Sequence, residues 1–330
     1  MGNVTSNSTV AVCLSANEVR ILAPIGKKLL PLCKSCNSMG DWENVLRTLF
    51  SANKISSKVH VKVILGPGLY TVAQLPKNEN LTDEELRSFA MYKDLEQTVS
   101  GQIADYTWDY YEAKTGNNSR PMLNFVLVEK KIIAQIAAIF EELAILESIT
   151  VHDLAMSAFI SYYQAYSLKK EELKKSGYVQ QLCITLYMPK ENDLVLYGVY
   201  EGELCYTRVL KGYRTLALPG AFDGNDVLVN RLVTEILRLS DDFFTSHLGL
   251  PQFTRLLLAI DSLNTETIAN VLSEQFKRTL EVVLVQTTPN ASYGFAVCDN
   301  AYIRELASDN LAYLPLLGEL MEREVPHEKN

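Results

Sequence analysis

The stretch TVAVCLSANEVRIL, residues 9–22, and the stretch LCITLYMPKENDLVLYGVYEGELCYTRVL, residues 182–210, decide the fold of this chain. Each contains runs rich in β-branched and aromatic residues on either side of a short polar turn, which is the pattern of a β-hairpin. A third extended run, at 28–32 and at 204–210, completes each unit, and helices follow. Because this order of strands occurs twice, it predicts two α/β lobes of related architecture.

The segment between the hairpins supplies the other elements of a first lobe. We expect helices at 42–50, 82–99, 130–146 and 153–166, and strands at 59–65, 70–75, 105–112, 123–128 and 148–151. The helix at 82–99 begins with a capping box, in which the Thr82 hydroxyl accepts from the backbone at Glu85. The first lobe is predicted to cover 1–177, with a core of 1–77 and 152–177 and an inserted subdomain of 78–151.

The second lobe is predicted to cover 178–330. After its hairpin we expect a helix at 226–239, a strand at 255–260, a helix at 265–276 and a strand at 280–285. The strand Arg255–Ile260 is apolar at almost every position, so it is expected inside a sheet that is covered on both faces. A chain of 330 residues also exceeds the size at which one hydrophobic core keeps growing, which favours two lobes.

Composition excludes several classes of function. The chain has 39 acidic and 31 basic residues and a net charge of −8, which argues against a nucleic-acid-binding surface. The best apolar window, 132–146, contains charged residues and is shorter than the ~20 residues of a membrane span. Residues 1–8 lack the pattern of a signal peptide. We therefore expect a cytoplasmic protein that reaches a membrane only through a partner.

The six cysteines give no strong indication of a metal or disulfide site. Cys33 and Cys36 form a single CxxC pair, and neither a second pair nor paired histidines follow to complete four zinc ligands. Without an export signal, reduced thiols are expected. We predict no metal site, and buried or unreactive thiols are favoured over a redox role.

Three further stretches resemble one family. They are EELRSFAMYKDLEQTV leading to ADYTWDYYEA (residues 84–113), FVLVEKKIIAQIAAIFEELAILESITVHDLAMSAF (125–159) and LVLYGVYEGELCYTRVL (194–210). Their order is similar to that of the PilM-type pilus assembly proteins, and within them to the MshI-type proteins of MSHA pilus biogenesis. The resemblance implies an α/β fold of the actin-like ATPase class (Hsp70/FtsA-like), with two lobes that each open with a hairpin-led sheet.

The family resemblance also implies a nucleotide cleft, and here the sequence departs from the pattern that such a cleft requires. Phosphate-binding turns need small, uncharged residues whose backbone N–H groups approach the phosphates. The first turn contains Ser15 and Asn17 but no glycine, and the second, with Lys190 and Asn192, also carries Pro189 and Glu191. The expected glycine pair is replaced at Asp261 and Ser262. We predict no catalytic residues and no cofactor; ATP with magnesium is the doubtful exception.

A binding role follows from the resemblance. It implies a non-catalytic scaffold that binds the cytoplasmic tail of a PilN-like inner-membrane pilus protein and that also contacts the assembly ATPase. Phe89, Tyr92 and Trp108 are candidate anchors for that tail, in a groove beside the helix at 82–99. The plain interpretation is that each aromatic belongs to the ordinary core. The alternative function is a divergent ATPase or phosphotransferase of the actin and sugar-kinase superfamily.

Overall fold

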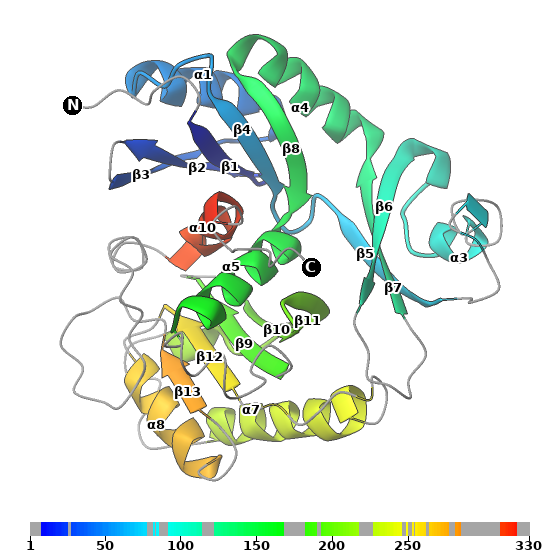
Figure 1. The fold of residues 1–330 in the computed structure, drawn as a ribbon, viewed down its shortest axis with the longest axis vertical. Helices are drawn as coiled ribbons and strands as arrows, with labels where there is room; N and C mark the ends of the chain where they lie inside the picture. The colour runs from blue at the N-terminus through cyan, green and yellow to red at the C-terminus, as the bar shows by residue number, and fades with distance from the viewer. Residues whose placement is uncertain are drawn as a thin grey trace, which may run out of the picture. The chain divides into compact units, whose positions relative to one another are not determined.

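The computed structural model describes residues 8–25, 28–77, 82, 84–85, 92–113, 122–167, 182–189, 193–217, 227–245, 249, 253, 255–261, 264–276, 281–284 and 311–321 (Figure 1). These residues fall into two compact units. Unit 1 contains the described residues up to Ala113 and from Met122 to Ala155, and unit 2 contains those from Met156 onward. The division lies inside helix α5, His152–Ser167. The boundary expected at 177–178 lies outside the described residues.

The main sheet of unit 1 has the strand order β3-β2-β1-β4-β8. Its strands are β1 (Thr9–Leu14), β2 (Glu18–Ile25), β3 (Lys28–Ser35), β4 (His60–Leu65) and β8 (Ile145–Val151). Strand β2 runs antiparallel to both β1 and β3, whereas β4 pairs in parallel with β1 and β8 in parallel with β4. The N-terminal hairpin predicted from the sequence is therefore confirmed, and β3 extends it.

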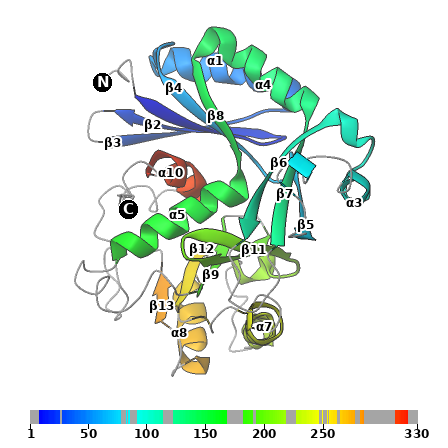
Figure 2. The ribbon, with the colours of Figure 1, turned by 45° about the vertical axis from the view of Figure 1, so that its right-hand side comes forward.

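Two helices cover one face of this sheet, α1 (Trp42–Ala52) and α4 (Lys130–Leu143) (Figures 1 and 2). Their apolar stripes pack on the inward side chains of β1, β2 and β4 in one core. Helix α4 ends at Leu143, earlier than the predicted 146. The reason is tertiary, because the backbone N–H of Ile145 donates to the carbonyl of Val59 at 3.0 Å and starts β8 at the edge of the sheet.

A small three-stranded sheet forms the rest of unit 1, in the order β5-β7-β6. Its strands are β5 (Thr71–Pro76), β6 (Tyr106–Ala113) and β7 (Met122–Glu129), with helix α3 (Tyr92–Glu96) and the turn η2 (Ile103–Asp105) beside them. Leu123, Phe125 and Leu127 pack on one face in a separate small core. Of the predicted insertion 78–151, the described residues 92–113 and 122–129 belong to this sheet and its flanking turns, whereas α4 packs on the main sheet and β8 is part of it.

The predicted capping box is present. The Glu85 backbone N–H donates to the Thr82 hydroxyl at 3.3 Å, and the Thr82 backbone N–H donates to the Glu85 carboxylate at 2.8 Å. The bonds that Thr82 donates to the carboxylate, from its backbone N–H and from its hydroxyl, lower the pKa of the Glu85 carboxyl. The described helix that follows, α3, ends at Glu96, before the predicted end at Val99.

Unit 2 repeats the topology of the main sheet, with the strand order β11-β10-β9-β12-β13. The strands are β9 (Leu182–Met188), β10 (Leu194–Tyr200), β11 (Glu203–Leu210), β12 (Arg255–Ile260) and β13 (Glu281–Leu284). All six residues of β12 are buried, as its apolar sequence predicted. Helices α7 (Val227–Arg238) and α8 (Thr265–Gln275) lie beside this sheet (Figure 1).

Short elements complete the fold. They are η1 (Met39–Asp41), η4 (Arg214–Ala217), the π-helical turn η5 (Leu239–Thr245), η6 (Leu311–Tyr313) and α10 (Leu314–Met321). The Tyr187 hydroxyl donates to the carbonyl of Leu311 at 3.3 Å and so joins η6 to β9. Phe244 packs over Gly198 in β10, where an added Cβ would lie 2.8 Å from the ring.

Trp42 supports the turn between β1 and β2, and its removal should destabilise unit 1. The side chain is fully buried, and its indole N–H donates to the carbonyl of Ser15 at 2.9 Å. We expect Trp42→Phe, which keeps a ring but no donor, to lower the free energy of unfolding by about 1–2 kcal/mol. Trp42→Ala should cost about 3–5 kcal/mol. Urea titration followed by circular dichroism measures both.

The half-buried Trp108 provides the control for this series, since Trp108→Phe should cost less than Trp42→Phe. A Trp42→Phe variant as stable as the natural protein would contradict the role of the indole hydrogen bond. In that case Trp42 would act through packing alone.

Candidate functional site

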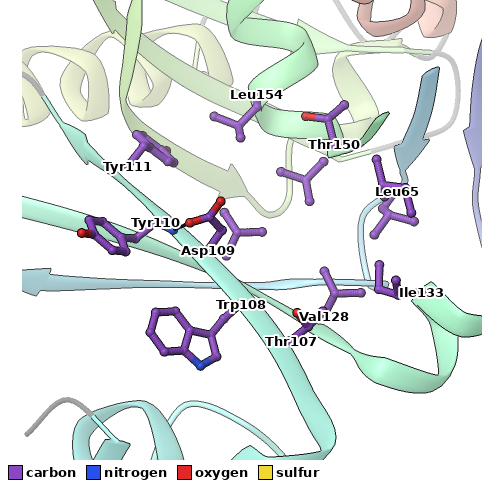
Figure 3. Close-up of a pocket in the computed structure, with 13 residues that line it drawn as sticks. Leu65, Thr107, Trp108, Asp109, Tyr110, Tyr111, Val128, Ile133, Thr150 and Leu154 are labelled. Atoms are coloured by element: carbon purple, nitrogen blue, oxygen red, sulfur yellow. Dashed lines mark hydrogen bonds between the residues drawn. The ribbon is translucent and has the colours of Figure 1, made fainter. Parts of the chain in front are cut away.

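Unit 1 contains a pocket of about 510 Å³ between the small sheet and the end of the main sheet (Figure 3). Its described lining comes from four strands and two helices: Leu65 of β4, Thr107, Trp108, Asp109, Tyr110 and Tyr111 of β6, Val126 and Val128 of β7, Ile133 of α4, Ile149, Thr150 and Val151 of β8, and Leu154 of α5. The volume lies within the range of small-molecule and peptide side-chain pockets.

The alternation of β6 decides which of its side chains belong to the pocket. Successive residues of a strand point to opposite faces, and residues paired across two strands share a face. Thr107 pairs with Val128 and Asp109 with Val126, whose side chains pack toward the main core. The pocket wall is therefore largely apolar, with the Asp109 carboxylate on the same face of the sheet.

Trp108 and Tyr110 point to the other face. Their rings lie 5.6 Å and 5.4 Å from the ring of Phe125, measured between centroids, inside the small core. Figure 3 shows the Trp108 ring and the Asp109 carboxylate extending to opposite sides of β6. Trp108 therefore belongs to the pocket lining although its ring packs against Phe125 on the other face of the sheet.

Two sheet edges border this pocket. Strand β6 is the last strand of the small sheet, and β8 is the last strand of the main sheet. Within the described residues, neither pairs with another strand on its outer side. An edge strand presents unpaired backbone N–H and C=O groups, which can pair with an added extended segment. The pocket thus combines an apolar wall with two backbone edges.

The first turn of α5 lies next to the pocket and is held by contacts of its own residues. The half-buried Tyr70 lies beside Asp153, in the first turn of α5, and desolvation of its phenol together with this carboxylate raises the pKa of Tyr70 well above its ordinary value. His152 Nδ1 lies 3.9 Å from the carboxylate of Asp153. These contacts hold the turn that carries Leu154 into the pocket wall.

The three predicted aromatic anchors have different outcomes. Phe89 lies outside the described residues, and so does the side chain of Tyr92, whose backbone begins α3. Trp108 packs against the small core, which agrees with the interpretation that this aromatic residue belongs to the ordinary core. Three further pocket residues, Thr107, Asp109 and Tyr111, were not predicted from the sequence. Their alternation with Trp108 and Tyr110 in the stretch ADYTWDYYEA was the available signal.

Of the residues predicted in the degenerate nucleotide turns, Ser15, Asn17 and Asp261 are described, and Lys190, Asn192 and Ser262 lie outside the described residues. The backbone N–H of Ser15 donates to the carbonyl of Glu18 at 2.9 Å, which closes the turn. The backbone N–H of Asp261 donates to the carbonyl of Met188 at 2.9 Å. Both donors are therefore used within the protein.

The turn after β4 packs closely against the first turn. The Gly66 backbone N–H donates to the carbonyl of Leu14 at 2.7 Å. A Cβ at position 66 would lie 2.4 Å from the Ser15 hydroxyl and 3.0 Å from the Leu14 carbonyl oxygen. Gly66 is therefore required by close approach, and the space beside Ser15 is filled by the protein itself.

The described residues contain neither a metal-binding cluster nor a membrane-spanning helix. No group of three or more His, Cys, Asp or Glu side chains among them is arranged to hold a metal ion. No helix in the described part of the chain is long and apolar enough to cross a membrane.

Comparison with known proteins identifies the fold. No family model matches the sequence, and no curated protein matches it. Among solved structures, a PilM–PilN type IV pilus biogenesis complex superposes with a TM-score of 0.60 at 13% identity, covering 98% of this chain and 100% of the other. The paired sheets and this likeness show that the chain has the actin-like ATPase fold, as the sequence predicted.

Other solved structures match less well. The cytoplasmic domain of EpsL, an inner-membrane component of the type II secretion system of Vibrio cholerae, has a TM-score of 0.47 at 8% identity and covers 96% of this chain and 95% of its own. A Bacteroides thetaiotaomicron protein with an actin-like ATPase fold and unknown function has a TM-score of 0.46 at 12% identity, with 84% and 91% covered.

Substitution of Gly66 should test the close packing of the two turns. Gly66→Ala is expected to lower the free energy of unfolding by about 1–3 kcal/mol, because the added methyl group meets backbone as well as the Ser15 hydroxyl. Gly68→Ala is the matched control: its φ of +89° makes alanine strained, but nothing lies within 4 Å of an added Cβ. Chemical denaturation would contradict the close packing if Gly66→Ala proved as stable as the natural protein.

Proposed function

We propose that this protein is a non-catalytic scaffold of a type IV pilus assembly platform, and that its pocket binds an extended cytoplasmic tail of an inner-membrane partner of the PilN type. The observation that carries the proposal is the position of the pocket between two edge strands, β6 and β8. The likeness to the PilM subunit fold supports the same role, since the matching structure is described as a complex of PilM with PilN.

The physical basis is strand addition. An extended tail gains backbone hydrogen bonds from a sheet edge, and its alternate side chains enter the adjoining pocket. The wall formed by Val126, Val128 and Ile133 favours apolar side chains, because their burial removes apolar surface from water at about 25 cal/mol per Å². Such a tail needs no folded structure of its own, so the partner can remain anchored in the membrane.

The finer assignment to an MSHA-type system rests on the sequence stretches quoted above and forms part of the proposal. In the same way we propose a cytoplasmic location beside the inner membrane, reached through the partner. Contact with the assembly ATPase is proposed on the family resemblance alone.

The proposal includes the absence of ATP turnover. The Ser15 and Asp261 backbone N–H groups are occupied by protein carbonyls, and these are groups that a phosphate-binding turn would present to its ligand. Gly66 packs against the Ser15 side chain and narrows the space at the first turn. These contacts support a scaffold over a divergent ATPase or phosphotransferase.

Thermal unfolding with nucleotide tests this part of the proposal. We expect Mg-ATP to leave the melting temperature unchanged and phosphate release to stay at the background rate. A ligand at ~100 times its dissociation constant would add about 2.7 kcal/mol of stability, which is a shift of several degrees. A clear upward shift that requires magnesium, together with turnover by the purified protein, would support the enzymatic alternative instead.

Blocking the pocket tests the binding site. Thr107 is exposed at the pocket wall, so Thr107→Trp should fill the space without disturbing a core. We expect it to weaken binding of the partner's tail at least ~10-fold, about 1.4 kcal/mol, in fluorescence anisotropy with labelled tails of PilN-like proteins from the same organism.

The matched control is Val209→Trp. Val209 is 50% exposed on β11, which is the edge strand of the sheet in unit 2. This variant should bind the tail as the natural protein does. Equal binding by the natural protein and Thr107→Trp, or equal weakening by both variants, would contradict the assignment of the pocket.

A further inference from the structure

We infer that the bound segment pairs with β8 and becomes an added strand of the main sheet of unit 1, while the edge of β6 stays unpaired. The inference rests on the proposed function, because it specifies how the extended tail is held in the same pocket. It goes beyond that function, which does not choose between the two edges. It also fixes which side chains of the tail face the apolar wall.

The lining of the pocket shows that β8 presents its edge there. Strand β7, in the middle of the small sheet, contributes only Val126 and Val128, which share one face. Strand β8 contributes the consecutive residues 149–151. Consecutive side chains point to opposite faces, so all three border one pocket only where the pocket runs along the backbone edge. Strand β6 meets this condition as well, and the backbone groups distinguish the two edges.

The register of β8 shows which of its backbone groups point outward. The N–H of Ile145 donates to the carbonyl of Val59 at 3.0 Å, so Ile145 directs its backbone groups toward β4. Ser148 pairs with Lys62, two positions farther along β4 than the partner of Ile145, and therefore has the same orientation. Because the direction of N–H and C=O alternates along a strand, Ile149 directs both groups to the outer side.

These outward groups of Ile149 are available to a ligand. Within the described residues, β8 pairs on one side only, and no backbone hydrogen bond is present on the outer side of Ile149. Ile149 is half-buried and borders the pocket. Backbone donors and acceptors that are partly removed from water gain when they find a partner. An extended segment provides both a carbonyl and an N–H at this position.

The edge of β6 is already engaged near its centre. The Tyr110 backbone N–H donates to the Asp109 carboxylate at 2.9 Å. The inward N–H groups of β6 are used in the ladder with β7, so this donor is one of the outward groups. A segment added along β6 would have to displace that bond. Asp109 and Glu112 also place charges on this edge, which oppose strand addition, whereas residues 149–151 carry none.

A strand added to β8 has one face covered by apolar groups. Val151 belongs to the main core, and Ile149 and Ile133 of α4 pack against that core. Helix α4 covers this face of the sheet (Figure 1). Alternate side chains of the added strand point to the same face, about 7 Å apart. The tail should therefore carry apolar residues two positions apart, because a polar side chain without a partner would be unfavourable there.

Amide hydrogen exchange, measured by NMR on the labelled full chain, tests the choice of edge. The probe is a synthetic cytoplasmic tail of a PilN-like protein from the same organism. We expect the tail to slow exchange of the Ile149 N–H at least ~10-fold, because this N–H gains a carbonyl acceptor. The Tyr110 N–H should exchange equally with and without the tail. Amides of β11, the edge strand of unit 2, are the control and should not change.

Methylation of single backbone nitrogens in the tail tests the pairing from the other side. A methyl group on the nitrogen that donates to the Ile149 carbonyl should weaken binding at least ~10-fold in fluorescence anisotropy. A methyl group on the next residue, whose N–H points away from β8, should change the affinity little. Such alternation is expected of a strand that is paired along one edge only.

The outcomes separate the inference from the proposed function. Slower exchange at Tyr110 without Ile149, or at both together, would overturn the inference and leave the proposed function intact, because the tail would then use β6. A tail that Thr107→Trp weakens but that protects neither amide would also overturn it, since the pocket would hold side chains without strand addition. A tail that does not bind, or that ignores Thr107→Trp, would count against both.

Discussion

The parallel pairing of β1 with β4 is the interaction on which unit 1 depends. Six consecutive residue pairs, from Thr9 with His60 to Leu14 with Leu65, join the N-terminal hairpin to a strand that begins after α1. Because β8 also runs parallel to β4, the carboxyl ends of three strands meet at one edge of the sheet. The turns that follow these ends, at Ser15, Gly66 and His152, are therefore brought together from distant parts of the chain. Both the closed first turn and the pocket arise at this edge.

Local patterns predicted the elements well, and non-local contacts account for the differences. The two hairpins, the buried strand β12 and the Thr82 capping box depend on residues close in sequence, so alternation and turn chemistry were sufficient. The end of α4 was misplaced because the stretch after Leu143 has helical spacing, while its backbone pairs with the edge of β4. Tertiary pairing overrides propensity there, and nothing local in the sequence indicates it.

The pocket was only partly predictable for a related reason. Strand alternation places Trp108 and Asp109 on opposite faces, and the sequence alone contains that information. The sequence does not indicate which face of the small sheet packs toward the main sheet, because both faces carry apolar residues. Packing of Trp108 against Phe125 settles the question. Trp108, which the sequence suggested as an anchor, packs against the small core, whereas Thr107 and Asp109 line the pocket.

Strands β6 and β8 both carry acidic residues, which matters because each is the edge of its sheet. Open edges invite pairing with other copies of a chain, and charged side chains on the edge oppose this. Strand β6 carries Asp109 and Glu112, and β8 carries Glu147. Identical acidic edges repel one another, so self-pairing is disfavoured. The acidic residues on β6 and β8 therefore oppose pairing between copies of this chain at the two edges that border the pocket, and the apolar wall of the pocket carries no such charge.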